Sequence, residues 1–192
     1  MSTASAGGAP FAHRLLWERL DEPGWEAACA FRTGAGWAIE SRYVGRRGGG
    51  PVAAHYELRL DANWATLRLE ASWGLGPDRR AIVLERTGGG WRVDGVPQPA
   101  LDGCVDVDVR WTPLTNTLPI RRLGLAPGAA REIDVAWIAE VDLSVHRNAQ
   151  RYTRLADRRW RFEALENGFA AEIEVDGEGF VLDYPALFRR LV

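Results

Sequence analysis

Apolar and polar residues alternate with a period of two along most of this chain, and the run from Gly103 to Trp111 shows the pattern most clearly. The two sides of that run are Val105, Val107, Val109 and Trp111, and Cys104, Asp106, Asp108 and Arg110. A period of two is typical of a β-strand with one apolar face. Similar runs recur roughly a dozen times between Gly- and Pro-rich turns, with no convincing long amphipathic helix. The sequence therefore predicts an all-β protein, antiparallel and mostly a meander.

The same alternation assigns individual side chains to the core and individual residues to turns. Three tryptophans fall on apolar strand faces and are predicted to be buried: Trp111, Trp137 and Trp160. One face of an early strand is predicted to point inward with Trp25, Ala27, Cys29 and Phe31. Asn167 and Gly168 predict a tight hairpin turn. Pro185 predicts a short C-terminal helical turn ending at Leu191.

The length of 192 residues favours one domain with a sizeable core. We expect residues 1–12 to be a disordered N-terminus and residues 13–192 to form that single domain. A sheet with so many strands has to curl or close, because it must bury its apolar face and hide its edges. The residues alone leave a sandwich, a closed barrel and an open roll as alternatives.

A dense polar segment follows the run that ends at Trp111. It contains Thr115, Asn116 and Thr117 between Pro113 and Pro119. Short hydroxyl and amide side chains suit local hydrogen bonds to the backbone, and the two prolines argue against a helix. We therefore predict a loop, after which residues 120–123 resume an extended strand. Polar loops between strands are common places for a binding site.

These residues also carry a family resemblance. The run TNTLPIRRL at Thr115–Leu123, preceded by Asp106 and Asp108, resembles the putative glycolipid-binding family of bacterial proteins. The tripeptide at residues 150–152 and the run VLDYPALFRR at residues 181–190 extend the resemblance over nearly the whole chain. The resemblance implies one large antiparallel meander sheet, curled into a spiral β-roll or half-barrel around a cavity. It also implies a lipid or glycolipid ligand in that cavity.

Charge and motif content exclude several other classes. A formal net charge of -2 gives no basic field for nucleic acid, although all 24 basic residues are arginines. The histidines at positions 13, 55 and 146 are far apart and lack the spacing of metal ligands. Asp106 and Asp108 are expected to pair with Arg110, Arg121 or Arg122 rather than with a metal ion. The sequence therefore predicts no metal and no cofactor.

The apolar runs, the first residues and the two cysteines indicate the cellular compartment that we expect for this protein. No apolar run reaches the roughly 18 residues of a membrane span, so stable membrane insertion is not expected. The first residues lack the positive start and apolar core of a secretory signal. Cys29 and Cys104 are accordingly predicted to be free thiols in the cytoplasm.

Two functions compete. The first is a non-catalytic protein that binds a lipid-like, possibly glycolipid, ligand in the cavity of the curled sheet. Its candidate ligand-binding residues are Asp106, Asp108, Thr115, Asn116, Thr117, Arg121, Arg122, Trp137 and Tyr152. Within this set, Asn116 is expected to hold the loop in shape together with Arg121, while an arginine of the 121–122 pair reaches the ligand.

The second function is an enzyme that acts on an anionic substrate in a charged tunnel, with Asp106, Asp108, Arg121 and Arg122. The E-x-E-x-K strand of tunnel phosphohydrolases is absent, and the chain has no lysine, which counts against this function. A third interpretation needs no ligand, because the same residues would fill a tight core. The groups that face the interior distinguish the three interpretations. An apolar cavity favours lipid binding, converging carboxylates and arginines favour catalysis, and the absence of a cavity favours a filled core.

Overall fold

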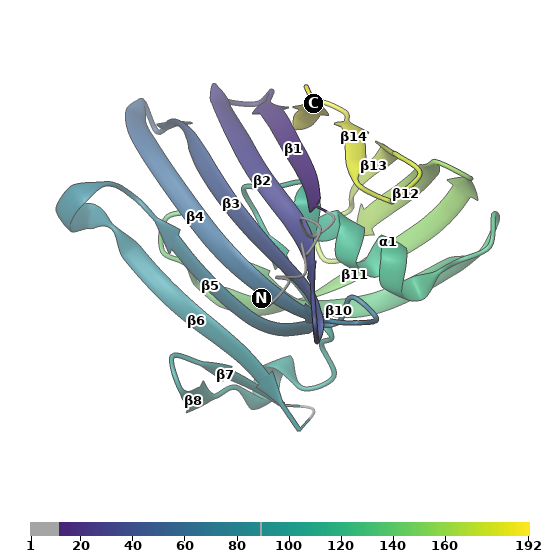
Figure 1. Ribbon diagram of the computed structural model, residues 1–192, viewed down its shortest axis with the longest axis horizontal. Coiled ribbons are helices and arrows are strands. Elements are labelled where there is room, and N and C mark those ends of the chain that lie inside the picture. Colours follow the sequence, from purple (N-terminus) through teal and green to yellow (C-terminus); the bar gives the residue numbers. More distant parts are fainter. Residues whose placement is uncertain (1–11, 89) are drawn as a thin grey trace, which may run out of the picture.

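The computed structural model describes residues 12–88 and 90–192, which form one open sheet of 15 strands, curled on itself (Figure 1). The strands are β1 (Ala12–Arg19), β2 (Gly24–Thr33), β3 (Gly36–Arg47), β4 (Gly50–Asp61), β5 (Thr66–Trp73), β6 (Arg80–Thr87), β7 (Gly90–Val93), β8 (Val96–Pro97), β9 (Asp106–Val109), β10 (Ala130–Ile138), β11 (Val145–Ala156), β12 (Arg159–Ala164), β13 (Phe169–Val175), β14 (Val181–Tyr184) and β15 (Phe188–Arg190). The all-β prediction is confirmed. Residues 1–11 of the predicted disordered N-terminus lie outside the described residues, and Ala12 already belongs to β1.

The sheet consists of two meanders that meet in its middle. The first meander is β1–β8, and the second is β10–β15, with β9 added at its edge. The order of the sheet is β8-β7-β6-β5-β4-β3-β2-β1-β15-β14-β13-β12-β11-β10-β9. The first and last strands of the chain join the two meanders, through the pairs Trp17–Arg190 to Arg19–Phe188. All neighbouring strands are antiparallel except β9 and β10, which are parallel. That pair departs from the predicted meander, because the helical segment between β9 and β10 allows the chain to return in the same direction.

The curl follows from one short connection. The chain passes from one edge strand, β8, to the other edge strand, β9, in the eight residues 98–105. Eight residues span at most roughly 28 Å, whereas 15 strands laid flat would be about 67 Å wide. The two edge regions therefore have to approach each other. Accordingly, the amide of Thr66 on β5 donates to the carbonyl of Val105, and Trp91 Nε1 on β7 donates to the carbonyl of Cys104.

The interior of the curl is filled by the segment that follows β9. It forms a 3₁₀ turn (Leu114–Asn116) and the helix α1 (Thr117–Leu123), which lies between the two halves of the sheet (Figure 1). Every residue from Trp111 to Ile120 is buried. One apolar cluster packs mainly the first meander against this segment, and a second cluster packs β11–β15 against it.

The prediction of a loop and a strand for residues 115–123 is therefore wrong. Pro119 falls in the first turn of α1, where its missing amide hydrogen would have had no intrahelical acceptor. Gly124 then ends the helix with a left-handed backbone at φ 52°. Two prolines at this spacing accommodate a short helix that follows a 3₁₀ turn.

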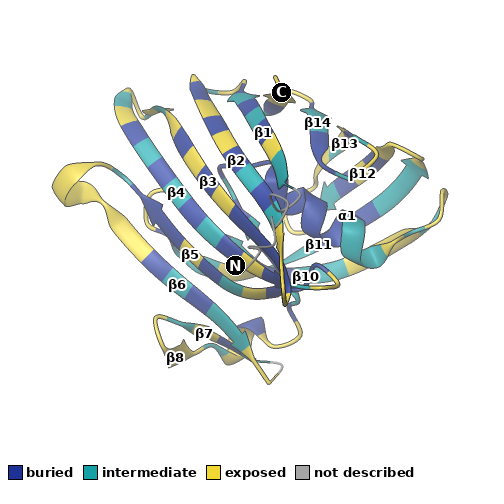
Figure 2. Ribbon diagram, viewed as in Figure 1, coloured by how far each residue is buried: buried dark blue, intermediate teal, exposed yellow. Residues whose placement is uncertain are grey.

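Two further local predictions differ from the structure. Buried and exposed residues alternate along β2 (Figure 2). Its inward face carries Glu26, Ala28 and Ala30, while Trp25 is 46% exposed. The large apolar side chains of β2 therefore lie on its outer face, because the carboxylate of Glu26 and its hydrogen-bond partners occupy the inner face. The chain end also differs: Pro185–Leu191 is a turn followed by β15, because pairing with β1 and β14 satisfies that backbone as a strand.

The remaining core predictions are mostly confirmed. Trp111 and Trp160 are buried, at 0% and 3% exposed, whereas Trp137 is only partly buried because it lines a pocket. The Asn167-Gly168 turn joins β12 and β13 as predicted.

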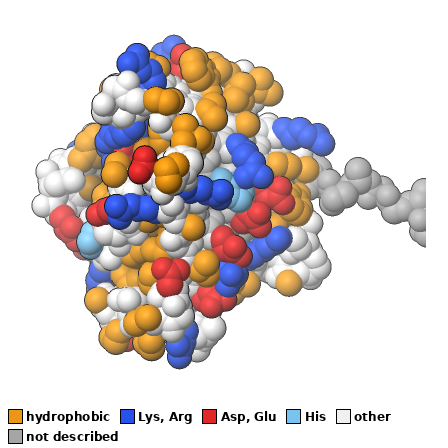
Figure 3. Space-filling model, turned by 90° about the vertical axis from the view of Figure 1, so that its left-hand side faces the viewer, with side chains coloured by type: hydrophobic (Ala, Val, Ile, Leu, Met, Phe, Trp, Pro, Cys, Tyr) orange, Lys and Arg blue, Asp and Glu red, His pale blue; other side chains and the backbone are white. Residues whose placement is uncertain are grey.

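The outer surface mixes side chains of opposite charge with apolar ones. Figure 3 shows the side of the molecule formed by the first meander, where basic and acidic side chains are interspersed. On β5, for example, Arg68 pairs with Glu70 and with Glu85 of β6. Among the described residues, no helix is long and apolar enough to cross a membrane.

A candidate ligand-binding pocket

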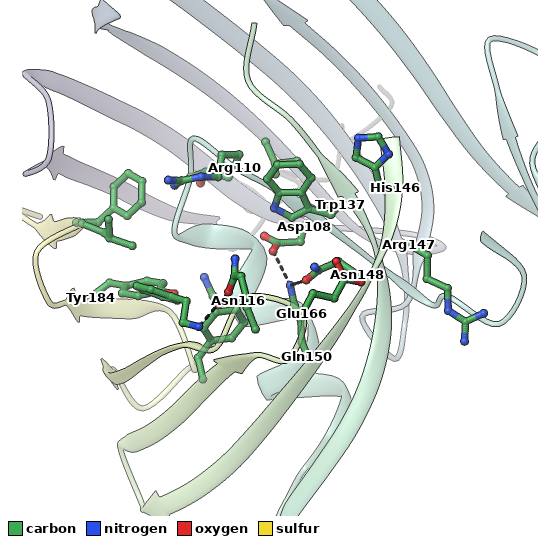
Figure 4. A pocket seen from close by; sticks show the side chains of 18 residues that line it. Asp108, Arg110, Asn116, Trp137, His146, Arg147, Asn148, Gln150, Glu166 and Tyr184 are labelled. Atoms are coloured by element: carbon green, nitrogen blue, oxygen red, sulfur yellow. Dashed lines mark hydrogen bonds between the residues drawn. The ribbon is translucent and has the colours of Figure 1, made fainter. Parts of the chain in front are cut away.

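A pocket of about 410 Å³ lies beside the interior segment, on the concave side of the second meander (Figure 4). Its lining residues come from β9–β15 and from the segment after β9, and they are Asp108, Val109, Arg110, Thr112, Asn116, Trp137, His146, Arg147, Asn148, Gln150, Phe162, Ala164, Glu166, Asn167, Phe169, Tyr184, Leu187 and Phe188. The volume lies within the 300–1,000 Å³ that is usual for small-molecule sites.

One part of the lining is a polar network centred on Asp108. Its Oδ1 accepts a hydrogen bond from Thr115 Oγ1 at 3.0 Å, and its Oδ2 accepts one from Gln150 Nε2 at 2.7 Å. The same Gln150 amide donates to Asn148 Oδ1 at 3.2 Å. Desolvation raises the pKa of Asp108, and the bonds from Gln150 and Thr115 oppose that rise. The network ties β9 to β11 and to the 3₁₀ turn.

A second polar contact holds the 3₁₀ turn against β11. Tyr152 Oη donates to Asn116 Oδ1 at 3.0 Å, and Asn116 Nδ2 donates to the carbonyl of Pro113 at 3.1 Å. Asn116 thus clasps its own turn, as predicted. Its partner on the sheet is Tyr152, however, and not the expected Arg121.

The other part of the lining is aromatic and comes from four neighbouring strands, β12–β15. The ring centroids of Phe162 and Phe169 are 6.2 Å apart, those of Phe162 and Tyr184 6.2 Å, and those of Tyr184 and Phe188 6.5 Å. These spacings are typical of tilted and edge-to-face aromatic pairs. Across the pocket, Trp137 stacks with His146 at 6.2 Å. The pocket is therefore amphipathic, with a polar part and an aromatic part.

The structure divides the candidate residues predicted from sequence into three groups. Asp108, Asn116 and Trp137 line the pocket, and Thr115 and Tyr152 bond to lining residues from behind. Four candidates do not line it: Asp106, Thr117, Arg121 and Arg122. The ligand-binding role of all nine remains a prediction.

Asp106 and Arg122 form a structural ion pair away from the pocket. Arg122 Nη2 lies 2.6 Å from Asp106 Oδ2, and Arg122 Nε lies 3.0 Å from Asp106 Oδ1. Asp106 is fully buried, so the pair ties β9 to α1. The predicted arginine pairing is thus confirmed for Asp106. It is wrong for Asp108, whose hydrogen-bond partners are neutral.

Arg121 points to a different region. Its guanidinium carbon lies 4.3 Å from the ring centroid of Trp64 and 5.4 Å from that of Trp37. It also bonds to the carbonyl of Glu178. Arg121 borders a second, more open hollow of about 260 Å³, formed with the turn between β13 and β14. The four charges of the enzymatic alternative are therefore divided among an ion pair, the main pocket and this hollow.

Sequence reasoning missed the aromatic wall and Arg110. Phe162 and Ala164 alternate correctly along β12, but alternation cannot distinguish a face that fills a core from one that lines a cavity. For Arg110, the sequence predicted only an ion pair with the aspartates. Within residues 12–88 and 90–192, no cluster of three or more histidine, cysteine or acidic side chains is placed to hold a metal ion.

Fold and site together define an all-β protein with an amphipathic pocket inside a curled, open sheet. The chain belongs to the family described as "Putative glycolipid-binding", whose model matches residues 14–190. Its fold is similar to that of a DUF1089 family protein from Pseudomonas aeruginosa, known from a crystal structure, with a TM-score of 0.77. The two are 35% identical, and the match covers 100% of this chain and 98% of that one. No curated protein matches the chain.

Proposed function

We propose that this protein is a non-catalytic binding protein for an amphipathic, lipid-like ligand, and that the ligand class is the glycolipid that its family description suggests. The observation that carries the proposal is the division of one pocket of about 410 Å³ into an aromatic wall and a polar network. A ligand with an apolar portion and a polar head matches both parts at once.

The aromatic wall supports the apolar half of this proposal. Phe162, Tyr184 and Phe188 are buried, and Phe169 is 40% exposed at the pocket. Aromatic side chains present large apolar faces, against which a hydrocarbon chain or the C–H face of a sugar ring packs. The amide of Asn148 faces the same space, and its Nδ2 donates to none of the described residues, so it suits a hydroxyl group.

A binding role fits the polar network better than catalysis does. Both oxygens of Asp108 already accept hydrogen bonds, from Thr115 and from Gln150, so the carboxyl is held in place by its neighbours. The other three charged residues of the enzymatic alternative lie outside the pocket. We further propose a cytoplasmic location, which the free thiols of Cys29 and Cys104 support.

Titration with octyl glucoside, a sugar amphiphile with a neutral head, tests the proposal by calorimetry. Phe169→Ala removes part of the aromatic wall and is expected to weaken binding by about tenfold, because roughly 1–2 kcal/mol of apolar contact is lost. Leu165→Ala is the matched control, since Leu165 is 38% exposed, lies nearby in sequence and does not line the pocket. It should bind like the wild type.

Two results would contradict the proposal. One is equal octyl glucoside affinity in Phe169→Ala and the wild type, which would place the ligand elsewhere. The other is a protein purified from its own host that carries no lipid in native mass spectrometry and binds neither octyl glucoside nor another octyl amphiphile.

A further inference from the structure

Arg110 brings into the pocket a guanidinium that forms no ion pair with a described residue. Its backbone follows β9, where its amide donates to the carbonyl of Ile138, and its side chain is half-buried in the pocket lining. The guanidinium forms no hydrogen bond and no ion pair with any residue in 12–88 or 90–192. A half-buried arginine normally has a partner, because its five N–H donors lose water on burial.

The carboxylates whose charges act on Arg110 are already engaged. Asp21, in the turn between β1 and β2, receives two hydrogen bonds from Arg19, at 2.6 and 3.0 Å. Asp108 is held by Thr115 and Gln150. Asp21 and Asp108 both feel the charge of Arg110, but neither lies within ion-pair distance of it.

Tyr184 offers a second unused donor in the same part of the pocket. Arg110 and Tyr184 lie on one side of it, while His146 and Arg147 lie on the other (Figure 4). The Tyr184 hydroxyl forms no hydrogen bond with the described residues. Burial, and next the Asp108 carboxyl, raise the pKa of Tyr184, while Arg110 opposes the rise, so the hydroxyl keeps its proton and donates.

Three other ionisable groups of the lining differ from these two. Arg147 pairs with Asp134 at 2.5 Å and points away from the pocket (Figure 4). The His146 ring bonds to Ser144 Oγ at 3.1 Å. Glu166 lines the pocket from the β12–β13 turn, where it is exposed.

We infer that Arg110 and Tyr184 form a subsite for an anionic group, a phosphate or carboxylate, on the ligand of this pocket. The inference rests on the proposed function and deepens it, because it assigns the amphipathic ligand a negatively charged head. A guanidinium fork binds two oxygens of such a group, and the phenol supplies a further hydrogen bond.

Four probes, measured by calorimetry below their micelle concentrations, separate the charge from the tail. They are octyl phosphate, octyl glucoside, octyltrimethylammonium and inorganic phosphate. The wild type is expected to bind octyl phosphate at least about tenfold more tightly than octyl glucoside, because a charge-assisted contact is added. Octyltrimethylammonium should bind most weakly of the three octyl probes.

Variants assign the effect to the subsite. Arg110→Gln should weaken octyl phosphate binding by about 10- to 100-fold while octyl glucoside binding changes little. Arg110→Lys keeps the charge and should restore part of the affinity, and Tyr184→Phe should cost a smaller factor. Arg147→Gln is the matched control, since it removes a pocket arginine that already has a partner. Because Arg110 has no partner to leave unpaired, Arg110→Gln should melt like the wild type.

The outcomes separate this inference from the proposed function. Equal binding of octyl phosphate and octyl glucoside, both unaffected by Arg110→Gln, would overturn the inference and leave the proposed function standing. Inorganic phosphate that binds as tightly as octyl phosphate, and depends on Arg110, would support the anion subsite but contradict a lipid-like ligand. Octyl phosphate binding that falls equally in Arg147→Gln would also overturn the inference, because it would reflect overall charge.

Discussion

At the scale of single residues, Glu26 is the least expected side chain of the interior. It is 1% exposed on β2, where its Oε1 accepts hydrogen bonds from Ser41 Oγ at 2.6 Å and from Tyr56 Oη at 3.0 Å. Its Oε2 has no hydrogen-bond partner among the described residues. Burial raises the pKa of this carboxyl from 4.5 to about 7, and the hydrogen bonds from Ser41 and Tyr56 only partly oppose it.

This carboxyl predicts a pH dependence of stability with a definite sign. The folded protein keeps the Glu26 proton up to pH about 7, whereas the unfolded chain releases it near pH 4.5, so stability falls as pH rises between those values. Glu26→Gln cannot titrate, and its free energy of unfolding relative to the wild type should rise by about 3 kcal/mol from pH 4.5 to pH 8. Urea unfolding across that range measures the difference.

The matched control is Glu40→Gln, which removes an exposed carboxyl from the neighbouring strand β3. A Glu26→Gln difference that stays constant from pH 4.5 to pH 8 would show that burial does not shift this group.

At the scale of elements, the 3₁₀ turn and α1 were the hardest to anticipate. Their prolines and short polar residues are common in exposed loops, yet the whole segment from Trp111 to Ile120 is buried. The segment is helical because Pro119 falls in the first turn and Gly124 supplies the stop. Its buried environment comes from strands far away in sequence, which no local pattern specifies.

The clasp at Asn116 gives a prediction at this scale. Asn116→Ala leaves the buried Tyr152 hydroxyl without its 3.0 Å acceptor and the Pro113 carbonyl without its donor. We expect a loss of about 1–3 kcal/mol in the free energy of unfolding, measured with denaturant.

Thr117→Val is its matched comparison. Thr117 is fully buried in the same segment, but its hydroxyl has no hydrogen-bond partner among the described residues. The valine variant should be as stable as the wild type or more so. Equal losses in the two variants would mean that packing, and not the Asn116 hydrogen bonds, holds the turn.

At the scale of the whole molecule, the sequence predicted the class and the resemblance predicted the curl. Alternation located most of the strands, and it correctly placed Trp111 and Trp160 in the core. It misassigned β2, because the apolar side chains of Trp25 and Phe31 face outward there. The pocket was harder to predict, since its polar part and its aromatic part come from strands that pair only through the long-range sheet order.

Because the first and last strands pair, the order of strands in the sheet becomes the order in the chain after two changes. The chain is opened between β8 and β9, and its two ends are linked. A circular permutant that starts at Gly103, ends at Asp102 and links Val192 to Ala12 would place every strand directly after its neighbour in the sheet. Both cut residues are exposed, and the amide of Leu16 already donates to the carbonyl of Val192.

Because the β1–β15 pairing becomes local, this permutant should refold faster than the natural order, by stopped-flow fluorescence, and reach the same circular dichroism spectrum. Slower refolding would contradict this expectation. It would show that the β8–β9 connection guides the curl early, and that its loss slows folding more than the new β1–β15 connection speeds it. The natural connectivity is thus one of several that are compatible with the same sheet.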